Sequence, residues 1–590
     1  MLLLYVILTA MRFSYWNIKE FNNNDREEAK NLYRNGVNPL VSVILISRFK
    51  DNPSDIFAFL DTGSVQFSDP FLMADMGKAV TRIKKAIENN EKIAVYGDYD
   101  VDGMTSAATL ALWLESKNAQ YEIYIPKRIN ESGQAGEGFG LNNGALDTLK
   151  SRGVNLIITV DCGITANAEA AYAKSIGLDL IITDHHECRD MQPGDKLPEA
   201  IAVVNPKRFD CKYPYKYLAG VGVAFKLVCA LEDDYCSAEV FNRFGKYLAL
   251  GAIADVMPVT GENRKLICTG LEILNLNPGV GVKQLISEVC KENDTVTATT
   301  IGFVLAPRLN AAGRMSDPMI SVRLLLTEDI HEAGELVEHL CRLNSDRRNL
   351  EQEIYEKALT LLPKPEPDEP IILYSDEWNQ GVTGVVASRI AERYRLPAII
   401  ISINEAGIGR GSCRSSCDFD IYTALCSCKD ILENYGGHKK AAGMDILPEN
   451  IEELRKRFVK YYNEYIAENP GFGGLEVDYE VEKPELLLLD NIEALKQLEP
   501  YGNENQPPCL CVKNAKLIAI QSIGDGKHTR LKIEKSGHIF ACIFFSVPIK
   551  ELGVNIADTV DIAFEPQIND FRNQRTVQLQ LSDIRPSGEI

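Results

Sequence analysis

The stretch that decides the fold is KIAVYGDYDVDGMTSAATLALWLES, residues 92–116. An apolar strand, KIAVY at 92–96, leads into the polar turn GDYDVDGMTS at 97–106, and a helix follows from Ala107. A continuous apolar strand that feeds a helix through a short turn is typical of a parallel sheet buried on both faces. This segment therefore predicts an α/β domain.

The same order of elements recurs on both sides of this stretch. A helix is predicted before it at 69–90, and NLIITVDCGI at 155–164 and LDLIITDHHE at 178–187 are further apolar strands that end in acidic turns. We therefore predict a doubly wound parallel sheet. Ligands bind such sheets at the carboxyl ends of the strands, so the three acidic turns should lie together.

The chain after residue 330 predicts a long helix, then a second α/β pattern and then a β-rich segment. Apolar residues recur at helical spacing over 330–362 and predict a long connecting helix, which the proline-rich PKPEPDEP at 363–370 ends. A fresh α/β pattern follows, and short alternating strands after Cys511 predict a small β-barrel, separate from the rest. The predicted domains are an N-terminal segment at 1–68, the doubly wound domain at 69–270, a helical connector at 271–370, a second α/β domain at 371–460, and a linker with the barrel at 461–590.

The composition is that of a large globular chain with an acidic surface. Its 590 residues are 45% hydrophobic and 25% charged, which is too long a chain for one core. The net charge of −20 repels polyanions at long range, so a nucleic acid must bind in a groove where basic residues gather. Fifteen cysteines without a CxxC pair suit a reducing compartment, and we expect a cytoplasmic protein.

The apolar run MLLLYVILTAM at 1–11 stands where a signal peptide would lie. It has no basic start and no cleavage site, and it is far shorter than the ~20 residues that span a bilayer. We expect translation to begin at Met11 and no membrane association.

The first acidic turn carries Asp98, Asp100 and Asp102 at alternate positions. Alternate carboxylates on a tight turn can converge on Mg²⁺ or Mn²⁺, which prefer oxygen ligands. The alternative is that these acids cap the following helix and interact with its dipole. Taken alone, the turn does not decide between the two interpretations.

The other turns add ligands of the same kind. Asp161 ends the second strand, and Asp184, His185 and His186 end the third, in a chain that has only seven histidines. Asp255 is a further candidate, although an ordinary loop carboxylate explains it equally well by itself. Together these side chains are enough for two cations, the arrangement used for in-line attack on phosphorus.

GDYDVDGMTS, VDCGI, DHH and the later GGHKKAAG at 436–443 occur here in the order typical of the DHH phosphoesterase superfamily with its DHHA1 domain. The chain resembles that superfamily, and in particular its single-strand-specific exonucleases, over nearly its whole length. The resemblance implies a hydrolase that removes mononucleotides from the 5′ end of single-stranded DNA, in repair and recombination. It also implies a C-terminal barrel of the oligonucleotide-binding (OB) type.

The resemblance further implies roles for individual residues. Asp161 is expected to bridge two cations, Mn²⁺ or Mg²⁺, and Asp98, His186 and His438 are expected to be catalytic. Some relatives have a ligand histidine where this chain has Tyr96, and we expect Asp98 to help fill or orient that site. The expected metal ligands are Asp100, Asp102, Asp161, His185 and Asp255.

Arginines in small-residue segments are the candidates for contact with phosphate. APRLNAAGRM at 306–315 and the predicted loop GRGSCRSS at 409–416 stand out against the acidic background. In the barrel, Phe544, Phe545 and Phe571 are candidates for base stacking, with core packing expected for at least one of them. The expected substrate-binding residues are Arg128, Arg308, Asn310, Arg314, Ser412, Arg414, Gly436 and Gly437.

Two other functions remain open at this level. The same chemistry could act on short oligoribonucleotides or other small phosphoesters, although such relatives need no added barrel. A catalytically silent scaffold should have lost ligands, and none of the five is lost. Family resemblance suggests a monomer that binds single-stranded DNA, with a single-strand-binding protein and a helicase as further partners.

Overall fold

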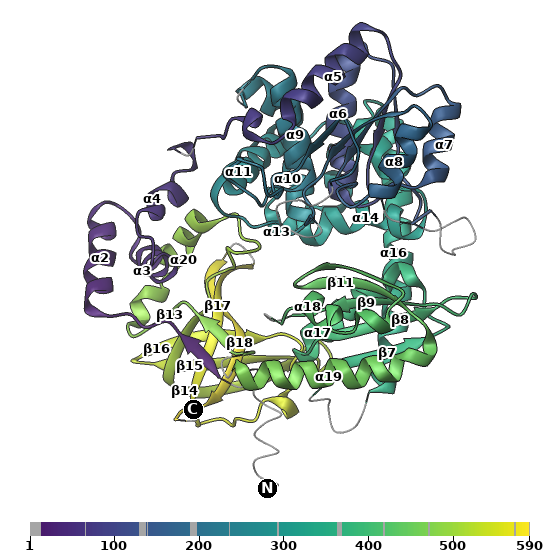
Figure 1. Cartoon of the computed structure of the whole chain (residues 1–590). Helices are drawn as coiled ribbons and strands as arrows, with labels where there is room; N and C mark the ends of the chain where they lie inside the picture. Colours follow the sequence, from purple (N-terminus) through teal and green to yellow (C-terminus); the bar gives the residue numbers. More distant parts are fainter. Residues whose placement is uncertain are drawn as a thin grey trace. The chain divides into compact units, whose positions relative to one another are not determined.

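The computed structural model (Figure 1) describes residues 13, 15–64, 66–128, 137–138, 140–188, 197–234, 236–291, 294–362, 369–416, 419–469, 472–571 and 574–588. The apolar run at 1–11 and most of PKPEPDEP lie outside these residues, as does the side chain of Phe571. The chain forms two compact units. The larger comprises 65–469 with 502–504, and the smaller comprises 1–64, 470–501 and 505–590.

A five-stranded parallel sheet lies at the centre of the larger unit. Its order, β3-β2-β4-β5-β6, reverses between β2 and β4, which confirms the doubly wound prediction. The carboxyl ends of β2 and β4 are therefore the switch point where ligands bind. The strands are β2 (Ile93–Tyr96), β3 (Tyr121–Tyr124), β4 (Leu156–Val160), β5 (Asp179–Thr183) and β6 (Ala202–Val204).

Helices cover both faces of this sheet, which explains why its strands are apolar throughout. Ile93 and Val95 share a core with α5, α6 and α9, whereas Ala94 and Tyr96 share one with α7 and α8. The helices are α5 (Met76–Glu88), α6 (Val101–Ser116), α7 (Asn143–Ser151), α8 (Asn167–Ser175), α9 (Gly220–Leu231) and α10 (Ala238–Ala254).

Helix α6 begins at Val101, earlier than the predicted Ala107. Asp100 is its N-cap, and the Asp100 carboxylate accepts a hydrogen bond from the Gly103 N–H at 3.1 Å. The alternative interpretation of the acidic turn as a helix cap is thus correct for Asp100. It does not exclude a ligand role, because a carboxylate has lone pairs for both.

Further helices pack on the same core and lead to the second sheet. The predicted long connecting helix is confirmed as α16 (Ile330–Leu361). The helices before it are α11 (Gly261–Leu276), α12 (Val280–Val289), α13 (Ala298–Thr300), the π-helical turn η3 (Ile301–Leu305), α14 (Ala306–Met315) and α15 (Met319–Leu326).

The second sheet of the larger unit has the order β10-β11-β9-β8-β7, in which only β7 and β8 are parallel. GRGSCR, predicted as a loop, is the strand β9. Its small residues Gly409, Gly411 and Cys413 alternate on the buried face, where Met444 leaves no room for a Cβ on Gly411. The elements are β7 (Ile371–Ser375), α17 (Gln380–Tyr394), β8 (Ala398–Ile403), β9 (Gly409–Arg414), α18 (Ile421–Cys426), β10 (Asn434–His438), β11 (Ala441–Ile446) and α19 (Ile451–Glu468).

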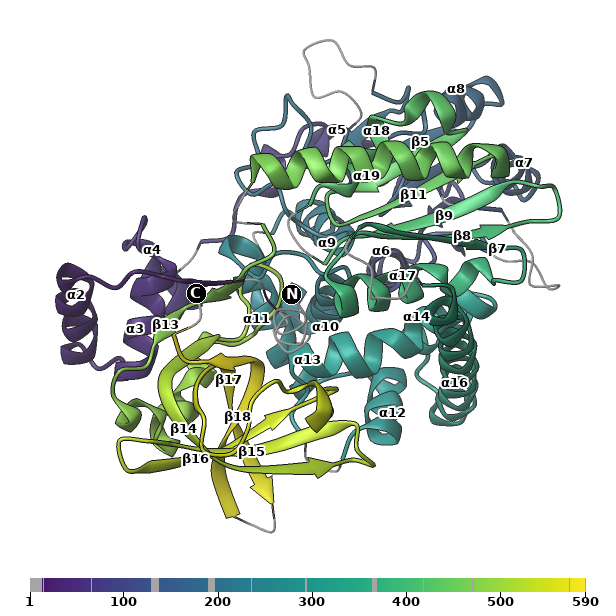
Figure 2. The ribbon, with the colours of Figure 1, turned by 90° about the horizontal axis from the view of Figure 1, so that it is seen from below.

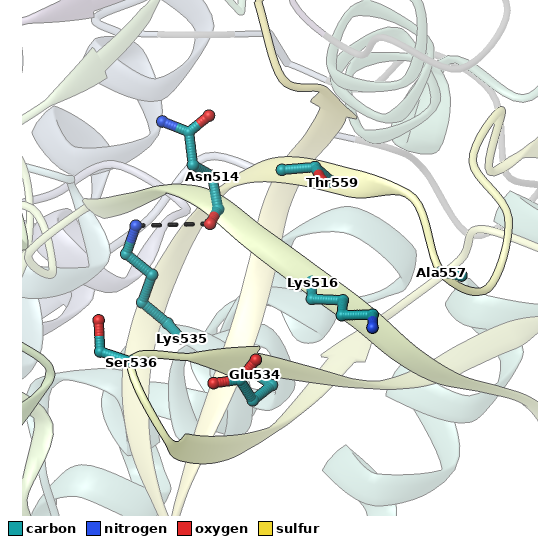
Figure 3. Close-up of a pocket in the computed structure, with 7 residues that line it drawn as sticks. All are labelled: Asn514, Lys516, Glu534, Lys535, Ser536, Ala557 and Thr559. Carbon is teal, nitrogen blue, oxygen red and sulfur yellow. Dashed lines mark hydrogen bonds between the residues drawn. The ribbon is translucent and has the colours of Figure 1, made fainter.

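The smaller unit contains the predicted barrel, which closes through neighbours β14-β15-β16-β18-β17 and back to β14. A polar cavity of about 490 Å³ opens between β14, the β15–β16 turn and the start of β17 (Figure 3), where Lys535 Nζ donates to the Asn514 carbonyl. Phe544 is buried in the core, whereas Phe545 is exposed. The strands are β14 (Leu510–Ile523), β15 (His528–Lys535), β16 (His538–Phe544), β17 (Thr559–Phe571) and β18 (Gln574–Pro586).

The N-terminal helices share their core with this barrel. Leu40 and Ile44 of α3 belong to the same hydrophobic cluster as Leu517 and Ile562, and Trp16 Nε1 donates to the buried Asp583 at 2.8 Å. The N-terminal helices and the barrel therefore belong to one compact unit. The remaining elements are β1 (Trp16–Ile18), α2 (Asn23–Arg34), α3 (Pro39–Arg48), α4 (Asp55–Leu60), β12 (Leu475–Val477), β13 (Tyr479–Glu480) and α20 (Leu489–Ala494).

A fully buried ion pair joins α9 to α11 in the larger unit. Lys226 Nζ lies 2.8 Å from Glu262 Oε1, and Glu262 Oε2 accepts from the Tyr213 hydroxyl at 2.8 Å. We predict that Lys226→Met lowers the free energy of unfolding by about 3–5 kcal/mol, because it leaves a buried carboxylate uncompensated. Thermal and urea unfolding measure the loss.

The control is Lys174→Met, because Lys174 and Glu199 form an exposed pair at 3.0 Å. Such a pair contributes at most about 1 kcal/mol. The double variant Lys226→Met/Glu262→Gln should lose less unfolding free energy than Lys226→Met alone, since it also removes the uncompensated Glu262 charge. Equal losses in Lys226→Met and Lys174→Met would contradict the prediction.

Candidate metal centre and phosphate pocket

The acidic turns after β2, β4 and β5 meet at the carboxyl edge of the first sheet, together with Asp255 at the end of α10. Within the described residues, three groups of side chains each bring their ligand atoms within 4.8 Å of one another. Asp161 and His185 each belong to two of these groups. The groups are Asp98, Asp100 and Asp161; Asp161, His185 and His186; and Asp102, His185 and Asp255.

Asp161 is held in a strained and crowded position. Its backbone has φ of 62°, which non-glycine residues rarely adopt and which is common at functional sites. A Cβ on Gly220 would lie only 2.6 Å from the Asp161 Cβ, so glycine is required there. Glycine at the start of α9 thus allows the carboxylate to lie against the helix.

Asp102 is anchored by the N-terminus of α9. Its two carboxylate oxygens accept hydrogen bonds from the backbone N–H groups of Gly220, at 2.6 Å, and Val221, at 2.8 Å. Free N–H groups and the helix dipole both favour an anion at this place. Our sequence analysis missed these two residues, although the small residues that open the apolar segment AGVGVAF at 219–225 were a visible signal.

Asp184 lies outside the three groups and organises the turn instead. It accepts backbone hydrogen bonds from Ile164, His185 and His186, and its Oδ1 lies 2.7 Å from His186 Nδ1. Although burial opposes the charged forms, this pairing lowers the pKa of Asp184 and raises the pKa of His186 to about 9. Asp184 is therefore the residue that orients His186.

The carboxylates of the cluster repel one another. Burial, and then the charges of neighbouring carboxylates, raise the pKa of Asp98, Asp161 and Asp255 well above the usual range, and that of Asp102 to about 7. Anions in such a place need positive charge close by.

Atoms that carry lone pairs in the cluster also lack partners. Asp98 Oδ1, Asp161 Oδ1 and both ring nitrogens of His185 are buried and make no hydrogen bond in the described chain. Asp161 Oδ1 and His185 Nε2 lie 3.1 Å apart, and neighbouring ligands of an octahedral cation with ~2.1 Å bonds lie at about that separation. The residues therefore fit divalent cations, and carboxylate with imidazole suits Mn²⁺ or Mg²⁺.

His438 comes from the second sheet and lies against His186. The two rings are stacked, with centroids 5.7 Å apart and planes at 20°. Desolvation, followed by the charges of His186 and Lys207, lowers the pKa of His438 to about 4. His438 ends β10, where Gly437 has φ of 140° and packs on Ala442, while Gly436 has open space beside it.

Three arginines converge next to the cluster, at the N-terminus of α17. Arg128 contacts the Tyr99 ring at 5.4 Å, and Arg314 NH1 lies 3.4 Å from the Gly381 carbonyl. A Cβ on Gly384 would lie 2.9 Å from the Arg414 guanidinium. Burial, and then the charges of Arg128 and Arg414, lower the pKa of Arg314 to about 10.

These three arginines, which we call the phosphate pocket, gather positive charge that favours an anion. In the part of the chain that the structure describes, Arg128, Arg314 and Arg414 form no ion pair with a carboxylate. Ser412 lies on the same strand as Arg414, and its hydroxyl is 3.0 Å from that of Thr383. Guanidinium forks, hydroxyls and a helix N-terminus together bind a phosphate group.

Two of the expected substrate-binding residues, Asn310 and Arg308, make other contacts in the structure. Asn310 Oδ1 accepts a hydrogen bond from the Val101 N–H at 3.0 Å, so it holds the first acidic turn in place. Arg308 NH1 donates to the Val304 carbonyl at 2.6 Å and lines a separate cavity. A direct role of either residue in substrate binding at the metal centre stays a prediction.

Family models match three parts of the chain: the DHH family N-terminal domain at 92–252, the DHHA1 domain at 368–464 and the RecJ OB domain at 477–583. The single-stranded-DNA-specific exonuclease RecJ of Bacillus subtilis is 38% identical and covers 96% of this chain, which spans 70% of that relative. Its counterpart in Escherichia coli is 32% identical over 87% of this chain and 91% of the relative.

Solved structures agree with these relatives. RecJ of Thermus thermophilus in complex with Mn²⁺ matches 98% of this chain and 80% of that chain, with a TM-score of 0.79 and 27% identity. An exonuclease RecJ bound to manganese matches 66% of this chain and 95% of that chain, with a TM-score of 0.54 and 34% identity. The three matched domains and the full-length relatives place the chain in the RecJ family of DHH proteins.

Proposed function

We propose that the protein is a divalent-cation-dependent exonuclease that hydrolyses single-stranded DNA from its 5′ end to mononucleotides, in DNA repair and recombination. The observation that carries this proposal is that the buried acidic cluster lies beside the phosphate pocket. A terminal phosphate held by the arginines leaves the next phosphodiester to lie at the carboxylates. The 5′ polarity rests on the family resemblance, because a terminal phosphate at either end of a strand fits the same arginines.

The metal ligands in this proposal are Asp100, Asp102, Asp161, His185 and Asp255, with Asp98 completing or orienting one site. Bound Mn²⁺ or Mg²⁺ would supply a water-derived nucleophile at neutral pH and neutralise the charge that develops on the phosphate. The N-terminus of α9 holds Asp102 in place for that task.

His186 is oriented toward the substrate by Asp184. With Nδ1 held at 2.7 Å by Asp184, we expect Nε2 to contact an oxygen of the scissile phosphate. His438 stacks on His186 and limits the movement of its ring. The second sheet thus takes part in the chemistry as well as in binding the 5′ end, through Ser412, Arg414 and the strand with Gly436 and Gly437.

The barrel supports a polymeric substrate. OB folds bind single strands by stacking and by contacts to the backbone, which a hydrolase of dinucleotides or pyrophosphate does not need. None of the helices in the described ranges is long and apolar enough to cross a membrane. Family likeness supports our further proposals of a cytoplasmic monomer that works with a single-strand-binding protein and a helicase.

The first prediction about function concerns Asp161. We expect Asp161→Ala to abolish hydrolysis of 5′-labelled single-stranded DNA in Mn²⁺, because a shared carboxylate has no substitute in the cluster. Circular dichroism should show an intact fold. Asp147→Ala is the control, since Asp147 lies on the surface and pairs with the Tyr172 hydroxyl. More than a few per cent of residual activity at saturating Mn²⁺ would refute the assignment.

The second prediction concerns Arg414. A charged hydrogen bond contributes ~1.5–3 kcal/mol, so Arg414→Ala should weaken binding of a 5′-phosphorylated strand by about ten- to hundredfold. Strands without a 5′-phosphate should bind nearly as before. Arg410→Ala is the control on the same strand, because Arg410 pairs with Asp445 at 2.7 Å. An unchanged preference for the phosphorylated end would place the pocket elsewhere.

The third prediction separates the two units. Because the N-terminal helices need the barrel, a fragment that ends at Glu499 should aggregate, whereas one spanning 65–469 should fold. The latter should still cleave short oligonucleotides but lose affinity for long strands, since stacking contributes ~1–3 kcal/mol per base. Its binding should also depend less on salt. Equal losses on a trinucleotide and on a long strand would contradict this division.

A further inference from the structure

A second polar cavity, of about 620 Å³, lies in the larger unit between α14, α16 and α17. These three helices adjoin one another (Figures 1 and 2). The cavity walls carry Arg308 from α14, Arg348 from α16 and Arg389 from α17. The cavity therefore gathers guanidinium groups from three elements of a chain whose net charge is −20.

The carboxylate in the cavity wall is already engaged. Glu351 accepts from Arg347 NH1 at 2.9 Å through one oxygen and from Arg389 NH1 at 3.0 Å through the other. Arg308 and Arg348 have no carboxylate partner among the described residues. The cavity thus carries two guanidinium groups without a carboxylate partner in the described chain, which favours an anionic ligand.

Arg308 also has a hydrogen-bond donor that lacks an acceptor. Its NH1 donates to a carbonyl of its own helix turn, whereas its Nε–H is buried without a hydrogen-bond acceptor in the described chain. Buried donors are nearly always satisfied, and an unmet one on a charged group is costly. A small reorientation toward a bound oxyanion would satisfy it.

The cavity is distinct from the phosphate pocket of the proposed active site. Arg308 precedes Asn310 by two residues, and residues at that spacing point to different sides of a helix. Asn310 contacts the first acidic turn, and Arg314 faces the pocket with Arg128 and Arg414. Helix α14 therefore has the active site on one side and this cavity on the other.

We propose that the cavity is a second anion site, which binds the phosphate group of a nucleotide. Its volume suits a ligand larger than bare phosphate, since ligand pockets measure ~300–1,000 Å³. Ser345 and Asn349 also line it and offer polar groups to a sugar or base. The proposed hydrolysis does not require this site, so the inference goes beyond that function.

Binding there would have a mechanical effect. Helix α14 carries Asn310 and Arg314 of the proposed active site. Helix α17 packs on the second sheet, and its N-terminus lies at the phosphate pocket. A phosphate shared by Arg308, Arg348 and Arg389 would tie these helices together. Bound nucleotide should therefore slow hydrogen exchange in α16 and α17.

The test measures binding of dAMP and inorganic phosphate to the full chain by equilibrium dialysis, in EDTA to exclude binding through cations. Arg414→Ala is present in every sample to weaken the other phosphate pocket. We expect one dAMP per chain and weaker binding of phosphate. Adding Arg348→Glu should lower the affinity at least tenfold, and Arg348→Lys should retain most of it. Arg348 is exposed, so its replacement should not disturb the fold.

Arg342→Glu is the matched control, because Arg342 is exposed on the same helix and pairs with Glu338 at 2.7 Å outside the cavity. A single-stranded oligonucleotide without a 5′-phosphate is the third ligand. Loss of dAMP binding in Arg348→Glu identifies a free nucleotide as the occupant, and loss for the oligonucleotide alone identifies a strand phosphate.

Equal affinities of Arg348→Glu and Arg342→Glu for all three ligands would overturn the proposal, as would no binding of any ligand in the Arg414→Ala protein. Neither result bears on hydrolysis, which depends on Asp161 and is measured separately. A failure of this inference is thus distinguishable from a failure of the proposed function.

Discussion

Repulsion among buried carboxylates is the constraint on which the rest of the structure depends. Asp98, Asp102, Asp161 and Asp255 are brought within ligand distance of one another or of His185, and each has a raised pKa. Only a fixed scaffold can hold anions so close. The reversal of strand order brings the turns together, and the N–H groups that open α9 stabilise one carboxylate before any cation binds.

The acidic and basic side chains of the site lie in different places. The carboxylates lie in the turns that follow the strands of the first sheet. The guanidinium groups converge where α14 meets the N-terminus of α17. Tyr99 contacts both groups, since it stands between Asp98 and Asp100 in the sequence and its ring packs against Arg128. A phosphodiester chain can therefore meet cation-binding groups and anion-binding groups side by side.

Local patterns predicted the parts of the fold that local interactions determine. The apolar strands, the long helix α16 and the acidic turns follow from periodicity and from the rule that ligands lie at a switch point. The contact of Gly220 and Val221 with Asp102 was missed, because it joins residues more than a hundred positions apart and the small residues of AGVGVAF do not name their partner. Strand β9 was mistaken for a loop because its glycines serve close packing and not a turn: Gly411 lies against Met444 and Gly409 against Ile401.

The shared core of α3 and the barrel has a consequence for synthesis on the ribosome. Helix α3 is made near the start of the chain, but β13 and α20, which pack on it, begin only at Tyr479 and Leu489. At ~5–20 residues per second, the apolar face of this helix waits roughly 20–90 s for its partner. During that time the nascent chain exposes a surface that trigger-type chaperones bind, so expression should be more sensitive to chaperone supply than the fold of the larger unit alone would require.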